Sequence, residues 1–134
     1  MKHIANARFA IKAWDEKPYR ELDDGTRFSR ADVTLRGPED GLTSGTSESL
    51  LFYRADGTSS FVTVMHLTGT VGGRSGGFVL QGQGTYDGTT ARVETRVVEG
   101  SGTGGLAGLR GTAESVSTHA DYPYMPLSLR YDIE

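Results

Sequence analysis

The chain has 134 residues, with 19 glycines, no cysteine and a formal net charge of −3. This length predicts one domain, residues 1–134, with a core of its own, and the lack of cysteine excludes disulfides, zinc thiolates and thiol nucleophiles. Basic residues form no cluster, and apolar runs stay far shorter than a membrane span or a signal-peptide core. We therefore expect a soluble cytoplasmic protein without nucleic-acid or membrane partners.

Apolar and polar residues alternate along most of the chain, which is typical of β-strands. In the first run, Ala7, Phe9, Ile11 and Ala13 are predicted to share one face, and a turn-prone stretch follows over residues 15–24. The remaining strands are predicted over residues 28–36, 46–53, 61–67, 78–86, 91–98, 112–118 and 127–133.

The turns between these runs carry a recurring signal. Asp-Gly pairs, which favour hairpin turns, occur at Asp24, Asp56 and Asp87. About eight short strands joined by hairpins predict an all-β fold, either a closed eight-stranded antiparallel up-and-down barrel, which we favour, or a sandwich. Such a barrel leaves room for side chains or for one small ligand. The best helical candidate is a single turn within Thr103–Leu109.

The hairpin from Leu50 to Leu67 is apolar on both strand faces. One face can fill the interior of a barrel, and the other needs a cover, which can be a short helix, a tail or another subunit. We therefore predict a homo-oligomer that forms through the Leu50–Leu67 hairpin.

Few residues of this sequence are candidates for a metal site or for catalysis. The three histidines lack the spacing of metal ligands, so we predict no metal site and no cofactor. His66 lies within an apolar strand, and Glu114 shares a strand face with Val116, so either side chain could point inward. An enclosed carboxylate or imidazole can act as a general acid or base, which makes these two the candidates for catalysis. The alternative for His66 is an ordinary core or interface histidine.

The stretch from Gly100 to Gly111 lacks the Lys-Ser or Lys-Thr ending and the following helix of a phosphate-binding loop. We interpret it as a tight crossing whose Leu106 and Leu109 plug one end of the barrel.

Four segments together resemble an uncharacterised bacterial domain family that is related to the allene oxide cyclase-like barrels: Trp14–Tyr19, Gly57-Thr58, Thr68–Gln81 and Val97–Gly111. The motif residues that we assign a structural role are Trp14, Arg74, Ser75, Phe78, Gly100, Gly102, Thr103, Gly104, Leu106, Gly108, Leu109 and Gly111.

The resemblance implies a closed, calycin-like meander of eight strands and no assigned activity. Better-known relatives of that family bind apolar small molecules in the lumen and steer their cyclisation, so we expect a small apolar ligand. The candidates to contact it are Phe9, Met65, Leu80 and Tyr131. The leading hypothesis is a binding barrel. The alternatives are a cyclase or isomerase acting on a small hydrophobic substrate, and a filled-barrel oligomeric scaffold without activity.

Overall fold

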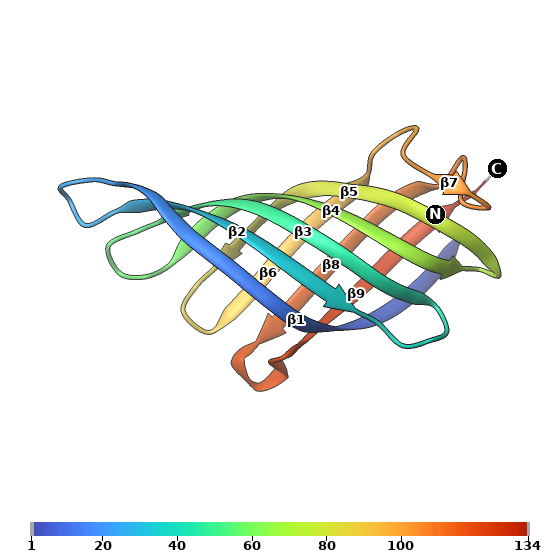
Figure 1. Ribbon diagram of the computed structural model, residues 1–134, viewed down its shortest axis with the longest axis horizontal. Helices are drawn as coiled ribbons and strands as arrows, with labels where there is room; N and C mark the ends of the chain where they lie inside the picture. Colours follow the sequence, from blue (N-terminus) through green and yellow to red (C-terminus); the bar gives the residue numbers. More distant parts are fainter. Residues whose placement is uncertain (1, 134) are drawn as a thin grey trace.

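The computed structural model describes residues 2–133, which form nine antiparallel strands and one short 3-10 helix. Eight strands pair in a closed ring, in the order β1-β2-β3-β4-β5-β6-β8-β9 and back to β1, while the short β7 pairs with β5 (Figure 1). The all-β prediction is confirmed. The elements are β1 His3–Glu21, β2 Arg27–Arg36, β3 Leu42–Tyr53, β4 Ser59–Val71, β5 Arg74–Tyr86, β6 Thr90–Val97, β7 Thr103–Gly104, β8 Arg110–Thr118, η1 His119–Asp121 and β9 Tyr124–Asp132.

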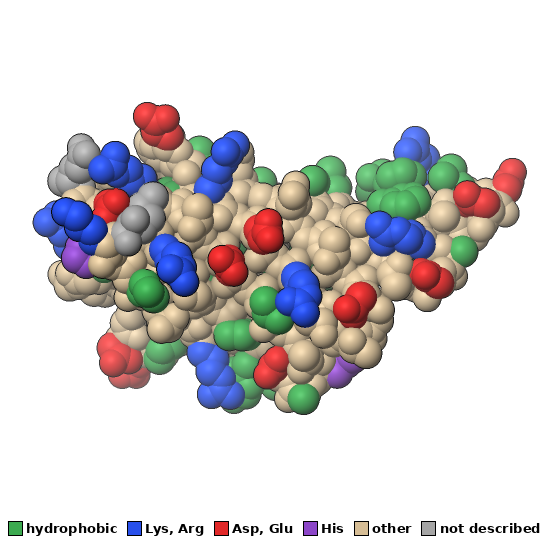
Figure 2. All heavy atoms as spheres, turned by 180° about the vertical axis from the view of Figure 1, so that it is seen from behind, with side chains coloured by type: hydrophobic (Ala, Val, Ile, Leu, Met, Phe, Trp, Pro, Cys, Tyr) green, Lys and Arg blue, Asp and Glu red, His purple; other side chains and the backbone are tan. Residues whose placement is uncertain are grey.

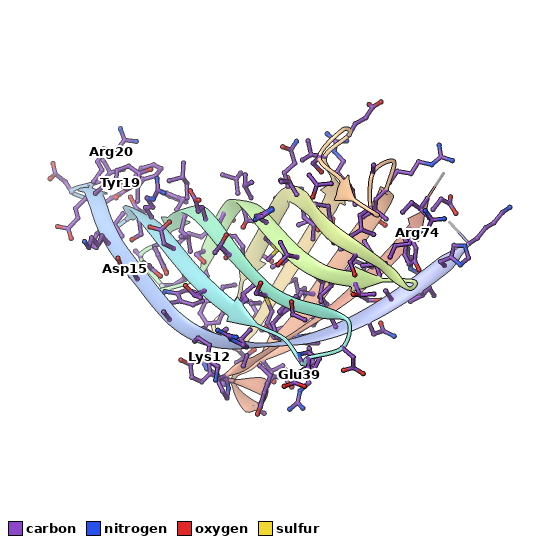
Figure 3. All side chains as sticks on the ribbon, turned by 45° about the vertical axis from the view of Figure 1, so that its right-hand side comes forward. Lys12, Asp15, Tyr19, Arg20, Glu39 and Arg74 are labelled. Carbon is purple, nitrogen blue, oxygen red and sulfur yellow. The ribbon has the colours of Figure 1, made fainter. Side chains whose placement is uncertain are left out.

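Strand β1 differs from the prediction in length and in the face of its second half. It continues to Glu21, through the stretch that we predicted to be a turn. Its pairing with β2 jumps from Ile11–Leu35 to Ala13–Thr34, so Lys12 is an extra residue in a β-bulge. A bulge exchanges the faces of the residues that follow it. Ala13 therefore lies on the outer face, not with Phe9 as predicted. Figure 3 labels Lys12, near which β1 bends.

The predicted helical turn within Thr103–Leu109 is not a helix. The segment contains β7 and a tight turn in which Leu106 N–H donates to the Thr103 carbonyl and Leu109 N–H donates to the Leu106 carbonyl. Glycine at four of these positions or next to them disfavours a regular helix. The helix that does form is η1, after β8.

A row of small side chains follows the strand pairing around the inner face of the ring. These residues pair in direct succession from strand to strand: Ala31, Ser49, Thr63, Gly82, Thr95 and Ala113. On one side of this row, large side chains such as Leu67, Phe78 and Leu80 are completely buried and fill the interior. We call the row the small-residue row, because it separates this packed half of the interior from the other half.

The packed half is closed by the two glycine-rich segments, which lie against each other. Gly76 pairs with Gly104, and the Thr103 hydroxyl accepts a hydrogen bond from Gly77 N–H at 3.0 Å. A side chain at Gly76 would overlap the Thr103 carbonyl, so the contact requires glycine. Leu106 and Leu109 are buried in the core below this contact, as predicted for a plug.

Three hairpin turns at the opposite end share the sequence Asp-Gly-Thr, and all three had been predicted from their Asp-Gly pairs. In each one, the carboxylate accepts hydrogen bonds from the backbone and hydroxyl of the threonine two residues later. These bonds stabilise the charged form and lower the pKa of Asp24, Asp56 and Asp87. The repeated motif explains why β1–β2, β3–β4 and β5–β6 all turn at this end.

Gly82, a member of the small-residue row, tests how closely β5 and β6 must approach each other. A Cβ at this position would overlap the carbonyl oxygen of Glu94 on β6, so β5 and β6 would have to separate. We expect Gly82→Ala to lower the free energy of unfolding by about 1–3 kcal/mol in urea denaturation. Thr85→Ala, at an exposed position of the same strand, should change it by less than about 0.5 kcal/mol. Equal effects of the two substitutions would contradict this role.

Candidate functional site

The ring opens sideways at the end that carries the Asp-Gly-Thr turns. β1 pairs with β9 as far as Ala10, and one further bond joins Ile11 N–H to the Pro123 carbonyl at 2.7 Å. Past this point, no strand within residues 2–133 pairs with β1 on the side opposite to β2. β8 likewise loses β9 after Glu114. We call the region between residues 12–21 of β1 and residues 115–118 of β8 the mouth.

Four side chains form a connected cluster on the inner face at the mouth. Glu16 accepts one hydrogen bond from Trp14 Nε1 at 3.0 Å and another from the Tyr53 hydroxyl at 2.6 Å. The Arg27 guanidinium lies over the Tyr53 ring, 4.1 Å from its centroid. Trp14 remains 53% exposed, while Glu16, Arg27 and Tyr53 are half-buried. We call these four residues the mouth cluster.

The strand register explains how residues from β1 and β3 meet. Glu16 lies opposite Ala31 of β2, and the next inward residue of β2 is Ser29, which lies opposite Leu51 of β3. Because Ala31 and Ser29 are small, Tyr53 can reach across β2 to Glu16. Ser29 is only 1% exposed, and its hydroxyl has no hydrogen-bond partner among the described residues.

The mouth cluster holds the Tyr53 phenol in its protonated form. Partial burial raises the pKa of Tyr53, and the hydrogen bond to Glu16 and the negative charge of that carboxylate raise it further, against a smaller opposing effect of Arg27. The cluster therefore combines a flat exposed indole, a hydrogen-bonded carboxylate and a phenol that donates its proton. This combination suits binding of a molecule with both an apolar and a polar part.

The other wall of the mouth carries a second polar contact. The Tyr86 hydroxyl lies 2.7 Å from His119 Nε2 and donates a hydrogen bond to the Gly88 carbonyl at 2.8 Å. Tyr86 contributes to the raised pKa of Tyr53, so the two phenols belong to one electrostatic neighbourhood.

The two candidates for catalysis, His66 and Glu114, do not face the interior. His66 and Glu114 are both exposed on the outer face, because the inward positions of their strands are occupied by Met65 and Leu67 and by Ala113 and Ser115. Glu114 also has a carboxylate neighbour that the sequence did not suggest, since Glu94 lies directly opposite it on β6. The inward orientation on which their candidacy for catalysis depended is therefore not found.

The four predicted ligand contacts do face inward. Phe9 and Leu80 are completely buried, Met65 is 4% exposed and Tyr131 is 7% exposed, all within one core cluster. They are packed against other core side chains, in the half of the interior that lies away from the mouth.

Sequence analysis missed the mouth cluster because it placed residues 15–24 in a turn. The alternation of Trp14, Glu16 and Pro18 was the available signal, since all three lie opposite inward residues of β2. This alternation becomes informative only once the strand is known to continue past Lys12.

Residues 5–131, nearly the whole chain, match the model of a protein family described as a protein of unknown function (DUF3224). The chain belongs to this family. It is also similar to a solved crystal structure, that of a DUF3224 protein of unknown function from Shewanella oneidensis MR-1. The two share 23% sequence identity over 98% of this chain and 99% of the other, with a TM-score of 0.70, which supports a common fold. A comparison with curated proteins found no match.

Two further findings bear on the site in this DUF3224 member. Among residues 2–133, no three histidine or acidic side chains come together in a way that could hold a metal ion. The short helix described over the same residues lacks the length and hydropathy to cross a membrane.

The raised pKa of Tyr53 gives a direct test of the mouth cluster. Alkaline titration of the ultraviolet absorbance of tyrosinate should show one late phenol, which Tyr53→Phe removes. The unfolded chain ionises this phenol near the ordinary tyrosine pKa of about 10, whereas the folded protein retains the proton. The free energy of unfolding should therefore fall as the pH rises above that value, and it should fall less in Tyr53→Phe. A difference between the two titration curves that shows the phenol of Tyr53 ionising near the ordinary tyrosine pKa of about 10 would rule out the effect of the hydrogen bond to Glu16.

Proposed function

We propose that this protein binds a small amphipathic molecule at the mouth of the ring, without turning it over. The apolar part of the ligand lies against the exposed indole of Trp14, and its polar end forms hydrogen bonds with the mouth cluster. The observation that carries this proposal is the half-buried Glu16 carboxylate, held by Trp14 and Tyr53 on an inner face that remains open to solvent.

The unpartnered Ser29 hydroxyl is an independent reason to place a ligand here. A buried hydroxyl without a partner costs free energy that a bound polar group can recover. Ser29 lies on the same face as Glu16 and is 1% exposed. A ligand hydroxyl or carbonyl that reaches this point would satisfy it.

The packed half of the interior favours the mouth over a deeper lumen site. A ligand that touched Phe9 or Leu80 would have to displace side chains that are completely buried, at a cost of several kcal/mol. Phe9, Met65, Leu80 and Tyr131 then serve as the floor that supports the mouth and not as its lining. The ligand is expected to be small and only partly enclosed.

We also propose that the fold is an up-and-down barrel of the allene oxide cyclase-like, calycin-like type. The closed order of eight antiparallel strands, each paired with the next around the ring, supports this assignment. In such barrels an end that is not plugged is the natural entry for a ligand.

The single tryptophan of the chain makes the experiment direct, because Trp14 reports on the mouth alone. Native mass spectrometry of protein purified from its own host tests for a retained small molecule. The purified protein is then titrated with medium-chain alcohols, fatty acids and hydroxylated aromatic compounds while Trp14 fluorescence is recorded. We expect a saturable change with at least one of these classes.

Two carboxylate variants distinguish specific binding from surface adsorption. Glu16→Ala should weaken the fluorescence-detected affinity by about tenfold or more, which corresponds to about 1.4 kcal/mol. Glu48→Ala, which removes an exposed outer-face carboxylate that pairs with Arg30, should leave it unchanged. Equal loss in both variants, or no saturable signal with any probe and no retained molecule, would overturn the proposal.

A further inference from the structure

The guanidinium of Arg27 has no anionic partner among residues 2–133, although the side chain is half-buried on the inner face at the mouth. The ion pairs described over these residues are formed by Arg30, and the Arg27 side chain takes part in no hydrogen bond among them. The guanidinium lies instead over the Tyr53 ring, with its central carbon 4.1 Å from the ring centroid. A contact with a ring face uses no N–H group, so the donors of Arg27 remain available to another molecule.

Two carboxylates lie in this part of the mouth, and neither pairs with Arg27. Glu21 is opposite Arg27 in the β1–β2 register, but its side chain is exposed to water. Glu16 already accepts a hydrogen bond at each of its oxygens, from Trp14 and from Tyr53. A half-buried positive charge has lost part of its hydration, so an anion bound beside it would be stabilised. Arg27 is therefore the charged group of the mouth cluster that is left for a ligand.

We propose that the ligand of the mouth is a small aromatic carboxylic acid whose carboxylate is bound by Arg27. This inference rests on the proposed function, since it assigns the chemistry of the molecule that the mouth binds. A planar guanidinium binds a carboxylate through parallel N–H donors, and a ring behind the guanidinium leaves these donors free. At the other side of the cluster, the indole of Trp14 is 53% exposed and offers a flat surface on which an aromatic ring stacks.

Ser29 adds a second donor on the same face. It is the next inward residue of β2 after Arg27, and its buried hydroxyl has no hydrogen-bond partner among the described residues. A carboxylate accepts hydrogen bonds at both oxygens, so a guanidinium and a hydroxyl can bind it together. An ammonium group would be repelled by Arg27, and an alcohol would leave the charge of Arg27 unpaired. The donors on β2 therefore favour a carboxylate over an amine or an alcohol.

The overall charge of the protein does not attract anions, so recognition of a carboxylate depends on this local contact. The formal net charge is −3, and acidic and basic side chains are interspersed over the face that Figure 2 shows. A second arginine, Arg20, also lies over a ring, 4.3 Å from the centroid of Phe28. It is exposed, and the strand register places it on the opposite face of the sheet from Arg27. Arg20 is therefore a matched control for Arg27.

The first experiment compares probes that share a ring and a carbon skeleton but differ in the end group: phenylbutyrate, phenylbutanol, phenylbutyramide and phenylbutylamine. Each is titrated at neutral pH into the full chain while the fluorescence of Trp14, its single tryptophan, is recorded. The carboxylate should bind at least about tenfold more tightly than the other probes. If the alcohol or the amide binds as tightly, the carboxylate assignment is overturned while the proposed mouth site stands. Absence of saturable binding by phenylbutyrate, phenylacetate and phenylhexanoate would also overturn the assignment.

The second experiment measures how variants change the preference for phenylbutyrate over phenylbutanol. Arg27→Gln should reduce this preference to about twofold or less, because it removes the charge that distinguishes the two probes. Arg27→Lys, which keeps the charge but lacks the planar fork, should retain an intermediate preference. Arg20→Gln should leave the preference as it is in the native protein. Since a ratio is measured, a general disturbance of the mouth affects both probes alike. An unchanged preference in Arg27→Gln, or an equal loss in Arg20→Gln, would overturn the role of Arg27.

Discussion

The interior of the ring is organised by the change from large to small inward side chains at the small-residue row. On one side of the row, large side chains such as Leu67, Phe78 and Leu80 are completely buried in one apolar cluster. On the other side, the buried inward residues include Ser29, Ser59 and Ser115, so the apolar cluster ends near the row. Glu16 pairs with Ala31 of the row and therefore stands at the edge of that cluster.

The glycine-rich segments and the mouth cluster contribute to the molecule in different ways. Gly76, Gly102 and Gly111 lie where a side chain would overlap neighbouring backbone, so they are required for strands and loops to pack at the closed end. Two segments of the family resemblance, Thr68–Gln81 and Val97–Gly111, lie at the end of the ring away from the mouth, whereas Trp14–Tyr19 includes Trp14 and Glu16 of the mouth cluster. The resemblance therefore involves both ends of the ring, and it assigns no chemistry to either of them.

Alternation and turn signals were enough to predict much of the fold, and the limits of the prediction have physical causes. β2 and β6 have one apolar and one charged face, so their inner residues were predicted correctly. β8 alternates small residues with Glu114 and Val116, and a pattern of that kind does not show which face is buried. β4 is apolar on both faces, which left His66 undecided. The mouth cluster could not be predicted because it depends on contacts between β1 and β3 across β2.

The bulge at Lys12 has a consequence for how related chains of different length can vary. Lys12 has no partner on β2, since Ile11 pairs with Leu35 and Ala13 pairs with Thr34. Deletion of Lys12 would make these two pairs consecutive, so the strand would become regular while Trp14 and Glu16 kept facing inward. Insertions in the hairpin turns would likewise leave both faces as they are. The chain can therefore lose a residue at position 12, or change length at the turns, without exchanging the inner and outer surfaces of the ring.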